Sequence, residues 1–358
     1  MKSALGKLTL TVVVVGLVIP LVMTGFANQA EARTLKWSHS GPPVGVHPTA
    51  QKWMAKEITR RTNGEIEFEF YWSASLIPVR DTVSGVGKGI ADIASPGMSM
   101  FTIGQNPHWS SVLLGFTDNY WAAQMAGYEA MTTNPYILAE FDKHNVVPTH
   151  GYVAGTDLNI FKERVTTLKE MKGKRFRCFG PVTTLMVKEV GMVPVSTPLW
   201  DVYDALGKGV IDGAWGAVNH YHSLKWYEVA KHASIRHPKT LCGDCTTLIN
   251  KDTWNSLSQS TRNIIKEVAS EYNDYYVQLI VEAEDSWIKE IKAAGANFHE
   301  YSPEVNDAYR AATKKALEEW FEKYDSKGNH TREVYEQVAA ALQKYEKEVA
   351  EKGYPWER

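Results

Sequence analysis

The sequence predicts an α/β protein built from two similar lobes, because one pattern occurs twice along the chain. Residues 77–94 and residues 197–214 align without a gap. The copies share a proline, a Gly-Lys-Gly triplet and two aspartates, which are Pro78 and Pro198, Gly87–Gly89 and Gly207–Gly209, Asp81 and Asp201, and Asp92 and Asp212. Each copy has proline where a helix would begin, glycine where it must end and a short apolar run after it, which is typical of a helix–turn–strand unit. Two such units predict two α/β lobes with a cleft between them.

The elements around the first copy predict a mainly parallel sheet. Trp53, Met54 and Ile58 recur at helical spacing, and the next segment alternates strictly between charged and apolar residues. The predicted elements are a strand at Leu35–Ser38 with a loop at His39–Pro42, a helix at His47–Thr62, a strand at Glu65–Tyr71, the repeated helix, and a strand at Ile90–Ala94 with a loop at Ser95–Ser99. A β-α-β-α-β chain folds as a mainly parallel sheet with helices on its faces.

The second lobe repeats this order, and a helical tail follows it. We expect Thr197 to cap the repeated helix and Pro198 to take its first position. The predicted elements are strands at Lys174–Cys178, Val193–Ser196 and Val210–Ala214, a helix at Val182–Val190, loops at Arg177–Pro181 and Trp215–Asn219, and tail helices at Asn263–Ala294, Pro303–Tyr324 and Thr331–Lys352. Because ligands sit beyond the carboxyl ends of parallel strands, the four loops of the two lobes should surround the cleft.

Composition and the N-terminus indicate an exported protein. The 358 residues carry a formal net charge of −2 and no basic block, which argues against a nucleic-acid partner. Lys2 and Lys7 precede an apolar run at Leu8–Phe26, and Ala30–Ala32 offers small residues for cleavage. This pattern predicts a signal peptide over residues 1–32 and a mature chain from Arg33 in the periplasm. The alternative is an uncleaved membrane anchor.

The three cysteines fit an oxidising compartment. Cys242 and Cys245 are close enough in sequence to pair with each other, which would leave Cys178 alone. Two free thiols or a redox site are the alternatives, but a strand and not a helix is predicted after Cys245. No second pair of cysteines or histidines completes a four-ligand metal site, and His220 with His222 is a spacing common by chance.

Five segments, in order and at the right spacing, resemble the DctP-type substrate-binding proteins of TRAP (tripartite ATP-independent periplasmic) transporters. They are the strand Met171–Arg177, the Gly-Met-Val-Pro-Val of Gly191–Val195, the helix Asp201–Leu206, the Gly-Val-Ile-Asp-Gly of Gly209–Gly213 and the Lys-Trp-Tyr-Glu-Val of Lys225–Val229. The resemblance implies a type II periplasmic-binding-protein fold in which two α/β lobes share a long helix and close on a ligand. It also implies delivery of the ligand to membrane permease subunits driven by an ion gradient.

The resemblance also sets the expected organisation and function. We expect lobe I at residues 33–152 and 241–280, lobe II at residues 153–240 and 281–300, and helices packing across both lobes at residues 301–358. The expected function is capture of a small organic acid by a monomer that is not an enzyme and uses no cofactor or metal. A periplasmic sensor of the same fold is the alternative, and a periplasmic enzyme is a weaker one, since no catalytic constellation has supporting context.

Arg177 is the first candidate ligand-binding residue. Its guanidinium presents a planar fork that matches a carboxylate, and it matches the family arginine that holds the ligand carboxylate. Trp215 and Asn219 follow the second repeated strand, and the tryptophan favours a flat or apolar ligand body. The family asparagine that supports the carboxylate is missing at Gly216. A solvated arginine and a core tryptophan are the alternative interpretations.

Further candidates lie on the other loops and near the cysteine pair. Phe179 would form an opposing aromatic wall, or simply pack. Met98 and Ser99 occupy the first-lobe loop that corresponds to Trp215–Asn219, and His39 can donate a hydrogen bond from the first loop, or lie at the surface. Asp244 would bind an amine or anchor its turn.

The proximity of Cys242 and Cys245 in an exported chain predicts a disulfide between them. Mass spectrometry of the non-reduced mature protein should show a mass two hydrogens lower than that of the dithiol form, with neither cysteine alkylated. Complete alkylation of both thiols without prior reduction would contradict the prediction, and Cys178 serves as the internal free-thiol reference.

Overall fold

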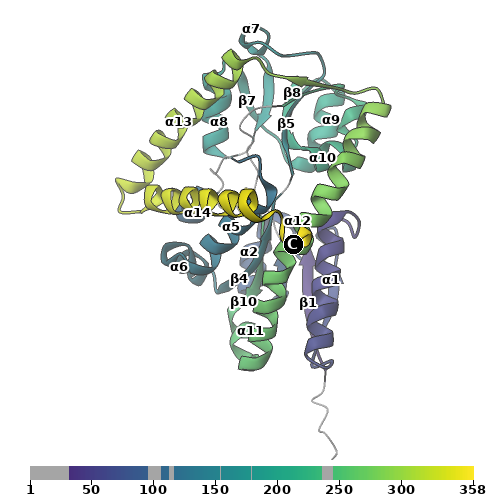
Figure 1. Cartoon of the computed structure of the whole chain (residues 1–358), viewed down its shortest axis with the longest axis vertical. Coiled ribbons are helices and arrows are strands. Elements are labelled where there is room, and N and C mark those ends of the chain that lie inside the picture. Colours follow the sequence, from purple (N-terminus) through teal and green to yellow (C-terminus); the bar gives the residue numbers. More distant parts are fainter. Residues whose placement is uncertain (1–31, 96–105, 113–116, 154, 179, 236–244) are drawn as a thin grey trace, which may run out of the picture.

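The computed structural model describes residues 32–95, 106–112, 117–153, 155–178, 180–235 and 245–358 (Figure 1). Residues 1–31 of the predicted signal peptide lie outside the described residues. Five of the predicted functional residues do as well: Met98, Ser99, Phe179, Cys242 and Asp244. The strands form two separate sheets, one of five strands and one of six, with helices on both. The two-lobe α/β fold predicted from the repeat is therefore confirmed.

Lobe I is built on the five-stranded sheet, in the order β2-β1-β3-β10-β4. Its strands are β1 (Arg33–His39), β2 (Ile66–Tyr71), β3 (Ile93–Ser95), β4 (Val146–Tyr152) and β10 (Cys245–Asn250), and its helices are α1 (Val46–Arg61), α2 (Thr82–Gly87), α4 (Pro107–Ser111), α5 (Tyr120–Thr133), α6 (Pro135–Lys143) and α11 (Lys251–Ser256). Strands β1, β2 and β3 are parallel, whereas β10 runs antiparallel between β3 and β4. The core includes the fully buried Trp37, Trp109 and Phe141.

Lobe II is built on the six-stranded sheet, in the order β11-β9-β5-β8-β6-β7. Its strands are β5 (Asp157–Phe161), β6 (Arg175–Cys178), β7 (Val193–Ser196), β8 (Gly213–Ala217), β9 (His232–Ile235) and β11 (Asn297–Glu300), and its helices are α7 (Leu168–Met171), α8 (Pro181–Glu189), α9 (Val202–Gly207) and α10 (Val218–Ser223). Strand β5 is antiparallel to both of its neighbours, and the pairs β6–β7, β6–β8 and β9–β11 are parallel.

The two copies of the repeat adopt the same backbone. Each begins with a single 3₁₀ turn, η1 (Val79–Asp81) or η3 (Leu199–Asp201), and continues into the short helix α2 or α9. Gly89 and Gly209 close the two helices with φ of 74° and 69°, a left-handed conformation that favours glycine. The expectation for Thr197 and Pro198 was wrong, because Pro198 precedes the 3₁₀ turn with extended backbone and no side chain caps it.

The strand after each repeated helix begins later than predicted. The amides of Ile90 and Val210 donate back to the carbonyls of Gly85 and Ala205, so these residues complete the helix end and cannot enter the ladder. Strand β8 therefore runs from Gly213 to Ala217 and α10 follows at once. The prediction of a loop at Trp215–Asn219 was wrong for this reason.

The conserved spacing of the repeat also places one aspartate in the same role twice. Asp92 accepts a hydrogen bond from the amide of Lys36 in β1 at 3.0 Å, and Asp212 accepts one from the amide of Arg175 in β6 at 2.8 Å. Asp92 thus links β1 to the start of β3, and Asp212 links β6 to the start of β8. The gapless alignment in the sequence corresponds to a common hydrogen-bonding plan in the structure.

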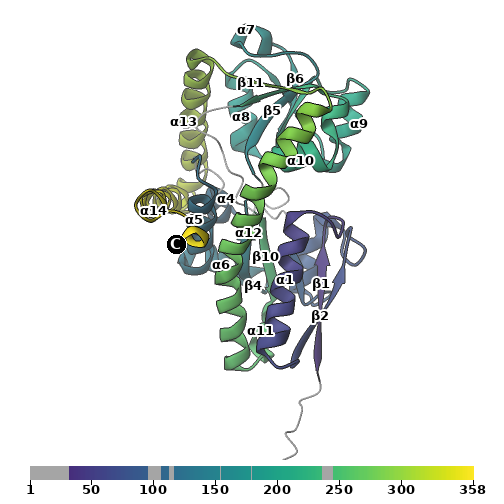
Figure 2. The same cartoon turned by 45° about the vertical axis from the view of Figure 1, so that its right-hand side comes forward.

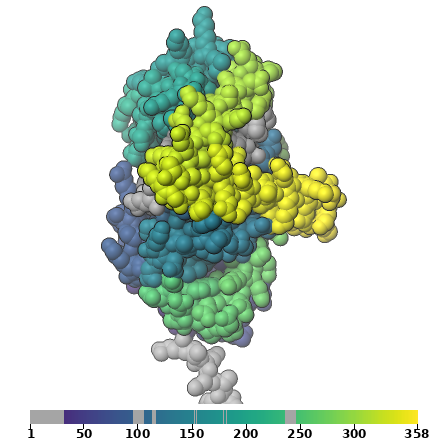
Figure 3. Space-filling model, turned by 90° about the vertical axis from the view of Figure 1, so that its left-hand side faces the viewer, coloured from purple at the N-terminus to yellow at the C-terminus, as the bar shows by residue number. Residues whose placement is uncertain are grey.

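Three long helices in the C-terminal part of the chain connect the two lobes. Helix α12 (Gln259–Ala293) runs along both lobes, as Figure 2 shows, and packs on α1 in lobe I and on α10 in lobe II. Helix α13 (Pro303–Asp325) packs on α8, and α14 (Thr331–Lys352) packs on α5. In the space-filling view, these two helices lie across one face of the molecule in yellow-green and yellow (Figure 3). Among the described helices, none is long and apolar enough to cross a membrane.

Gly216 in β8 is required by the packing of a neighbouring tryptophan. A Cβ atom at this position would lie 2.4 Å from Cζ3 of Trp226, whose ring is fully buried next to the strand. Trp226 begins the 3₁₀ turn η4 (Trp226–Glu228). The side-chain space at residue 216 is therefore already filled from inside lobe II.

Replacing Gly216 with alanine should destabilise the protein by about 1–3 kcal/mol, because the buried ring has to shift. Gly207→Ala is the matched control, since a Cβ there meets only Val229 at an ordinary 3.6 Å. Urea unfolding of the two variants measures the difference in the free energy of unfolding. Equal stability of the two variants would contradict the packing argument.

Candidate ligand-binding site

The carboxyl ends of the parallel strands in the two sheets face each other across one crossing segment. The chain leaves β4 at Tyr152 and enters β5 at Asp157, and the connection between them is called the crossing segment below. Strand β5 is antiparallel to β8, and Asp157 pairs with Ala217, the last residue of β8. The crossing segment therefore lies at the carboxyl end of both β4 and β8. Ligands of open α/β sheets bind at such ends, so this interlobe region is the candidate site.

Arg177 lies at this edge and is almost completely buried, with 2% of its surface exposed. Its Nε donates to the carbonyl oxygen of Thr197 at 3.1 Å, and its Nη1 donates to the carbonyl oxygen of Trp215 at 2.8 Å. Both of these acceptors are main-chain carbonyl groups, and they fix the orientation of the guanidinium. A buried positive charge held in a fixed orientation is the arrangement that an anion-binding site needs.

Trp215 contributes to the site through its main chain. Its side chain is 3% exposed and lies in the core of lobe II, in the same cluster as Phe176 and Met186. The packing of the indole therefore fits the alternative interpretation, in which Trp215 is a core tryptophan. The main-chain carbonyl of Trp215 accepts the hydrogen bond from Arg177. Asn219 lies on α10, half-buried, and its Oδ1 is buried without a hydrogen-bond partner among the described residues.

His220 is a residue of this edge that the sequence interpretation missed. Its Nδ1 accepts a hydrogen bond from the amide of Ala217 at 3.4 Å. Burial, with the positive charge of Arg177 as the second cause, lowers the pKa of His220 to about 4. The imidazole is thus neutral at pH 7 and close enough to Arg177 to sense its charge. Its neighbour His222 instead binds Glu290 at the surface, with 2.8 Å between Nε2 and Oε2.

His39 lies at the end of β1 in lobe I, where it begins a row of buried histidines. Its Nδ1 accepts from the amide of Gly41 at 2.9 Å, and its Nε2 contacts Nδ1 of His47 at 3.2 Å. A Cβ at Gly41 would lie 3.7 Å from the Trp200 ring of lobe II, so the two lobes approach each other at this loop. His39 is therefore buried and not a surface histidine, with 6% of its surface exposed.

The crossing segment itself is fixed by side chains from α5 and α12. Glu284 of α12 accepts from Oγ1 of Thr156 at 2.8 Å and also from the hydroxyl of Tyr120. Burial and the charge of Glu284 raise the pKa of Tyr120. The hydroxyl of Tyr276 donates to the carbonyl of Val153 at 2.5 Å. These bonds anchor the chain where it passes from one lobe to the other.

The position of Glu284 in the sequence could have identified it as a carboxylate with a buried partner. It continues the stripe of Tyr272, Tyr276 and Ile280 at four-residue spacing, which is the buried stripe of α12. A carboxylate on such a stripe indicates a buried partner.

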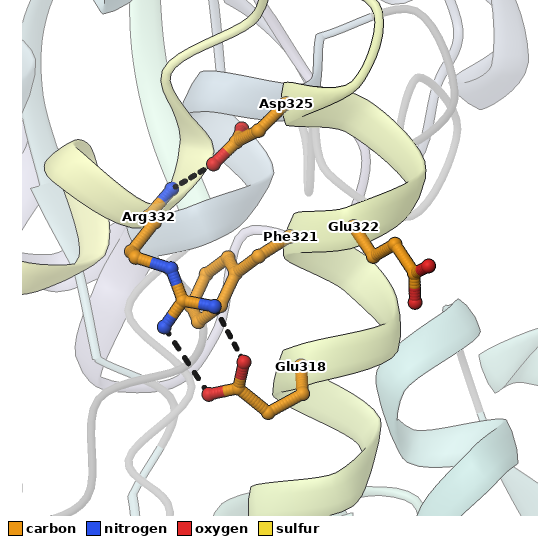
Figure 4. A pocket seen from close by; sticks show the side chains of 5 residues that line it. All are labelled: Glu318, Phe321, Glu322, Asp325 and Arg332. Carbon is orange, nitrogen blue, oxygen red and sulfur yellow. Dashed lines mark hydrogen bonds and ion pairs between the residues drawn. The ribbon is translucent and has the colours of Figure 1, made fainter.

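A surface hollow lies at the corner of α13 and α14 (Figure 4). It has a volume of about 320 Å³ and is lined by Glu318, Phe321, Glu322, Asp325 and Arg332. Arg332 donates to Glu318 at 3.1 Å and lies 4.6 Å from the centre of the Phe321 ring, and its amide donates to Asp325. The single guanidinium is engaged by these groups, so the hollow is a joint between two helices. Among the described residues, no group of His, Cys, Asp and Glu is placed to hold a metal ion.

Two α/β lobes joined by a crossing segment, with a buried guanidinium at their facing edges, are typical of a two-lobe solute-binding protein. The family model described as "Bacterial extracellular solute-binding protein, family 7", named DctP, matches residues 38–324. The chain belongs to this family, and thus to the DctP-type substrate-binding proteins of TRAP transporters.

Curated relatives and solved structures agree with this assignment. The sialic acid-binding periplasmic protein SiaP of Vibrio cholerae is 22% identical over 278 residues, which cover 77% of this chain and 86% of the relative. The C4-dicarboxylate-binding periplasmic protein DctP of Rhodobacter capsulatus is 22% identical over 275 residues, covering 76% and 81%. A TRAP solute-binding protein from a marine metagenome, in complex with pyroglutamate, superposes with a TM-score of 0.75 at 19% identity, covering 88% and 99%.

The structure brings together some of the predicted residues and separates others. Arg177, Trp215 and Asn219 lie within one edge of lobe II, around the end of β8. His39 lies in lobe I, at the end of β1. Their roles in binding stay predictions. Cys178 is a buried free cysteine. The pairing of Cys242 with Cys245 stays a prediction, because Cys242 lies outside the described residues.

The buried histidines of lobe I predict a loss of stability in acid. Burial lowers the pKa of His39 to about 4 and that of His150 to about 3, and it also lowers the pKa of His47. In the unfolded chain these groups titrate near 6.5, so below that pH the unfolded state takes up protons that the folded state cannot. Stability should therefore be fully present above about pH 6.5 and decrease as the pH falls toward 4, by on the order of 3 kcal/mol for His39 alone.

Urea unfolding at several pH values checks this slope. His39→Gln should flatten the pH dependence relative to the wild type. A wild-type stability that is the same at pH 7.5 and pH 5 would contradict the prediction.

Proposed function

We propose that this periplasmic solute-binding protein captures a small organic acid between its lobes and that Arg177 binds the carboxylate of that acid. The observation that supports this proposal is the buried guanidinium at the carboxyl edge of lobe II, oriented by two main-chain carbonyls. A desolvated guanidinium binds a carboxylate through two parallel hydrogen bonds, which gives both affinity and orientation.

The acid bound by each relative supports the class of ligand. Sialic acid, a C4-dicarboxylate and pyroglutamate, named for the three proteins above, all carry a carboxylate. We propose that the bound acid of this chain likewise presents one carboxylate to lobe II and its remaining body to lobe I. The indole of Trp215 packs in the core, so the apolar body of the ligand should contact other groups of the interlobe region.

Capture should be coupled to movement of the lobes. In the described part of the chain, the segment between β4 and β5, helix α12 and the consecutive helices α13 and α14 connect the lobes. Glu284 and Tyr276 fix the segment between β4 and β5 to α12. A hinge built from few segments allows rigid lobes to close on a ligand. We propose that the closed form then delivers the acid to membrane permease subunits; a periplasmic sensor of the same fold is the second candidate.

Replacing Arg177 with lysine should weaken binding of the acid by about 2–5 kcal/mol, because lysine keeps the charge but loses the planar fork. A thermal-shift panel of pyroglutamate, succinate and sialic acid first identifies an acid that stabilises the protein. Titration calorimetry then compares its affinity for wild type and the variant.

Arg175→Lys is the matched control for this experiment. Arg175 lies two residues earlier on the same strand, but it is exposed and bound to Asp212 with 2.7 Å between Nη2 and Oδ1. This variant should bind the acid as wild type does. A panel in which no acid stabilises the protein, or an Arg177→Lys variant that binds as tightly as wild type, would refute the carboxylate site.

A further inference from the structure

Trp200 is a large apolar side chain that is exposed on lobe II and yet has a neighbour in lobe I. Among the phenylalanine, tyrosine and tryptophan side chains that the structure describes, it is the single exposed one, with 47% of its surface exposed. It belongs to η3, the 3₁₀ turn between β7 and α9. A Cβ atom at Gly41 of lobe I would lie 3.7 Å from Cη2 of the indole, so the ring approaches the bare main chain of the other lobe. A contact of this kind buries little surface and can break when the lobes move apart.

The contact between Trp200 and Gly41, called the mouth contact below, lies on the side of both sheets away from the crossing segment. The crossing segment joins β4 to β5. In lobe I, β3 and β10 separate β4 from β1, which ends next to Gly41, and in lobe II, β8 and β6 separate β5 from β7. Figures 1 and 2 accordingly show β1 and α9 on one side of the molecule. When two lobes rotate about a hinge, the parts farthest from it move most, so opening of the lobes breaks the mouth contact.

The lobe I side of the mouth contact is held by a strained turn. Ser73 and Ala74, which follow β2, have φ of 54° and 55°, a left-handed conformation that is unfavourable for residues other than glycine. Their amides donate to the carbonyls of Gly41 and His39 at 2.8 Å and 2.9 Å. These two bonds fix the main chain that the indole approaches. Backbone strain of this kind, of about 1–3 kcal/mol per residue, persists where the surroundings demand one conformation and is concentrated at functional sites.

The lobe II side of the mouth contact is connected to the proposed carboxylate-binding group. Nε of Arg177 donates to the carbonyl of Thr197 at 3.1 Å, and Thr197 lies three residues before Trp200. The backbone of this segment does not require a tryptophan, because the first copy of the repeat adopts the same 3₁₀ turn with Arg80 at the equivalent position. The presence of the indole is therefore explained by its contact with lobe I and not by the local fold of lobe II.

We propose that the mouth contact is a latch: the indole of Trp200 holds the two lobes together opposite the crossing segment and slows the exchange of ligand. This inference rests on the proposed function, in which the ligand lies between the lobes. With the ring in place, a bound acid leaves only after the contact has broken. Without the ring, the bonds from Arg177 to the acid are unchanged, but the closed arrangement of the lobes is less stable, so the acid dissociates faster.

Two variants of Trp200 and one control test the latch. Trp200→Ala removes the ring, and Trp200→Arg replaces it with the residue that the first copy of the repeat carries in the same turn. Val193→Ala is the matched control, because Val193 is equally exposed, at 47%, but begins β7 and so lies at the end of the strand away from the mouth contact. Urea unfolding first checks that each variant is folded and keeps nearly the stability of wild type, as expected for exposed positions.

Two measurements then compare the variants with wild type. Small-angle X-ray scattering gives the radius of gyration of the ligand-free protein. Stopped-flow mixing gives the dissociation rate of the acid selected by the thermal-shift panel of pyroglutamate, succinate and sialic acid. Both Trp200 variants should have a larger radius of gyration than wild type and should release the acid about tenfold faster, with a smaller change in the association rate. Val193→Ala should match wild type in both measurements.

A wild-type radius of gyration or a wild-type dissociation rate in both Trp200 variants would overturn the latch, and so would equal effects in Val193→Ala. If the rates are unchanged while Arg177→Lys still weakens binding, the proposed function stands and only the latch falls. If no acid in the panel stabilises the wild-type protein, the proposed function fails at its own experiment, and scattering alone decides whether Trp200 holds the lobes together.

Discussion

The Glu284 carboxylate fixes the chain where it passes from one lobe to the other. It accepts hydrogen bonds from Thr156 in the crossing segment and from Tyr120 in α5, while Tyr276, two turns earlier on α12, binds the carbonyl of Val153. Helix α12 therefore acts as a rigid rod to which both the hinge and lobe I are attached. The direction in which β5 starts, and with it the placement of Arg177 and α10 relative to lobe I, depends on these bonds.

The distribution of charge across the interlobe region follows from burial. Lobe I presents His39, His47 and His150, all of which burial keeps neutral near pH 7. Lobe II presents Arg177, whose guanidinium keeps its charge at any physiological pH. In the proposed site, recognition of the anion is therefore assigned to lobe II, through Arg177.

The sequence predicted the fold because the repeat and the amphipathic helices are local patterns. The left-handed backbone after α2 and α9 favours glycine, so the glycines in the sequence predicted both helix ends correctly. The three tail helices were predicted to within a few residues. Helices α5 and α6 received no prediction. Helix α5 lies between α12, α14 and β4 and carries a single charged residue, Glu129, so it has no polar face and no period to recognise.

The site was harder to predict because its groups are positioned by contacts between distant segments. The pairing of Arg177 with the carbonyl of Trp215 depends on where β8 begins, and that start is delayed by the bond from Val210 back to α9. The sequence around His220 did not indicate that this residue lies near Arg177, because Arg177 belongs to a different strand, β6. Glu284 did give a signal, as a carboxylate on a buried stripe, but its partners lie 128 and 164 residues away.

The connectivity of lobe I has a consequence for how the chain reaches its native state. Strand β10 lies between β3 and β4, so the two halves of the sheet cannot join until residue 250 has been synthesised. Helix α5 is covered last, by α14, through contacts such as Glu129 with Lys344 and Tyr345. Until then the edges of β3 and β4 are open and the apolar surface of α5 is bare, a state prone to misassociation. With this order of contacts, lobe I cannot be completed until nearly all of the chain has been made.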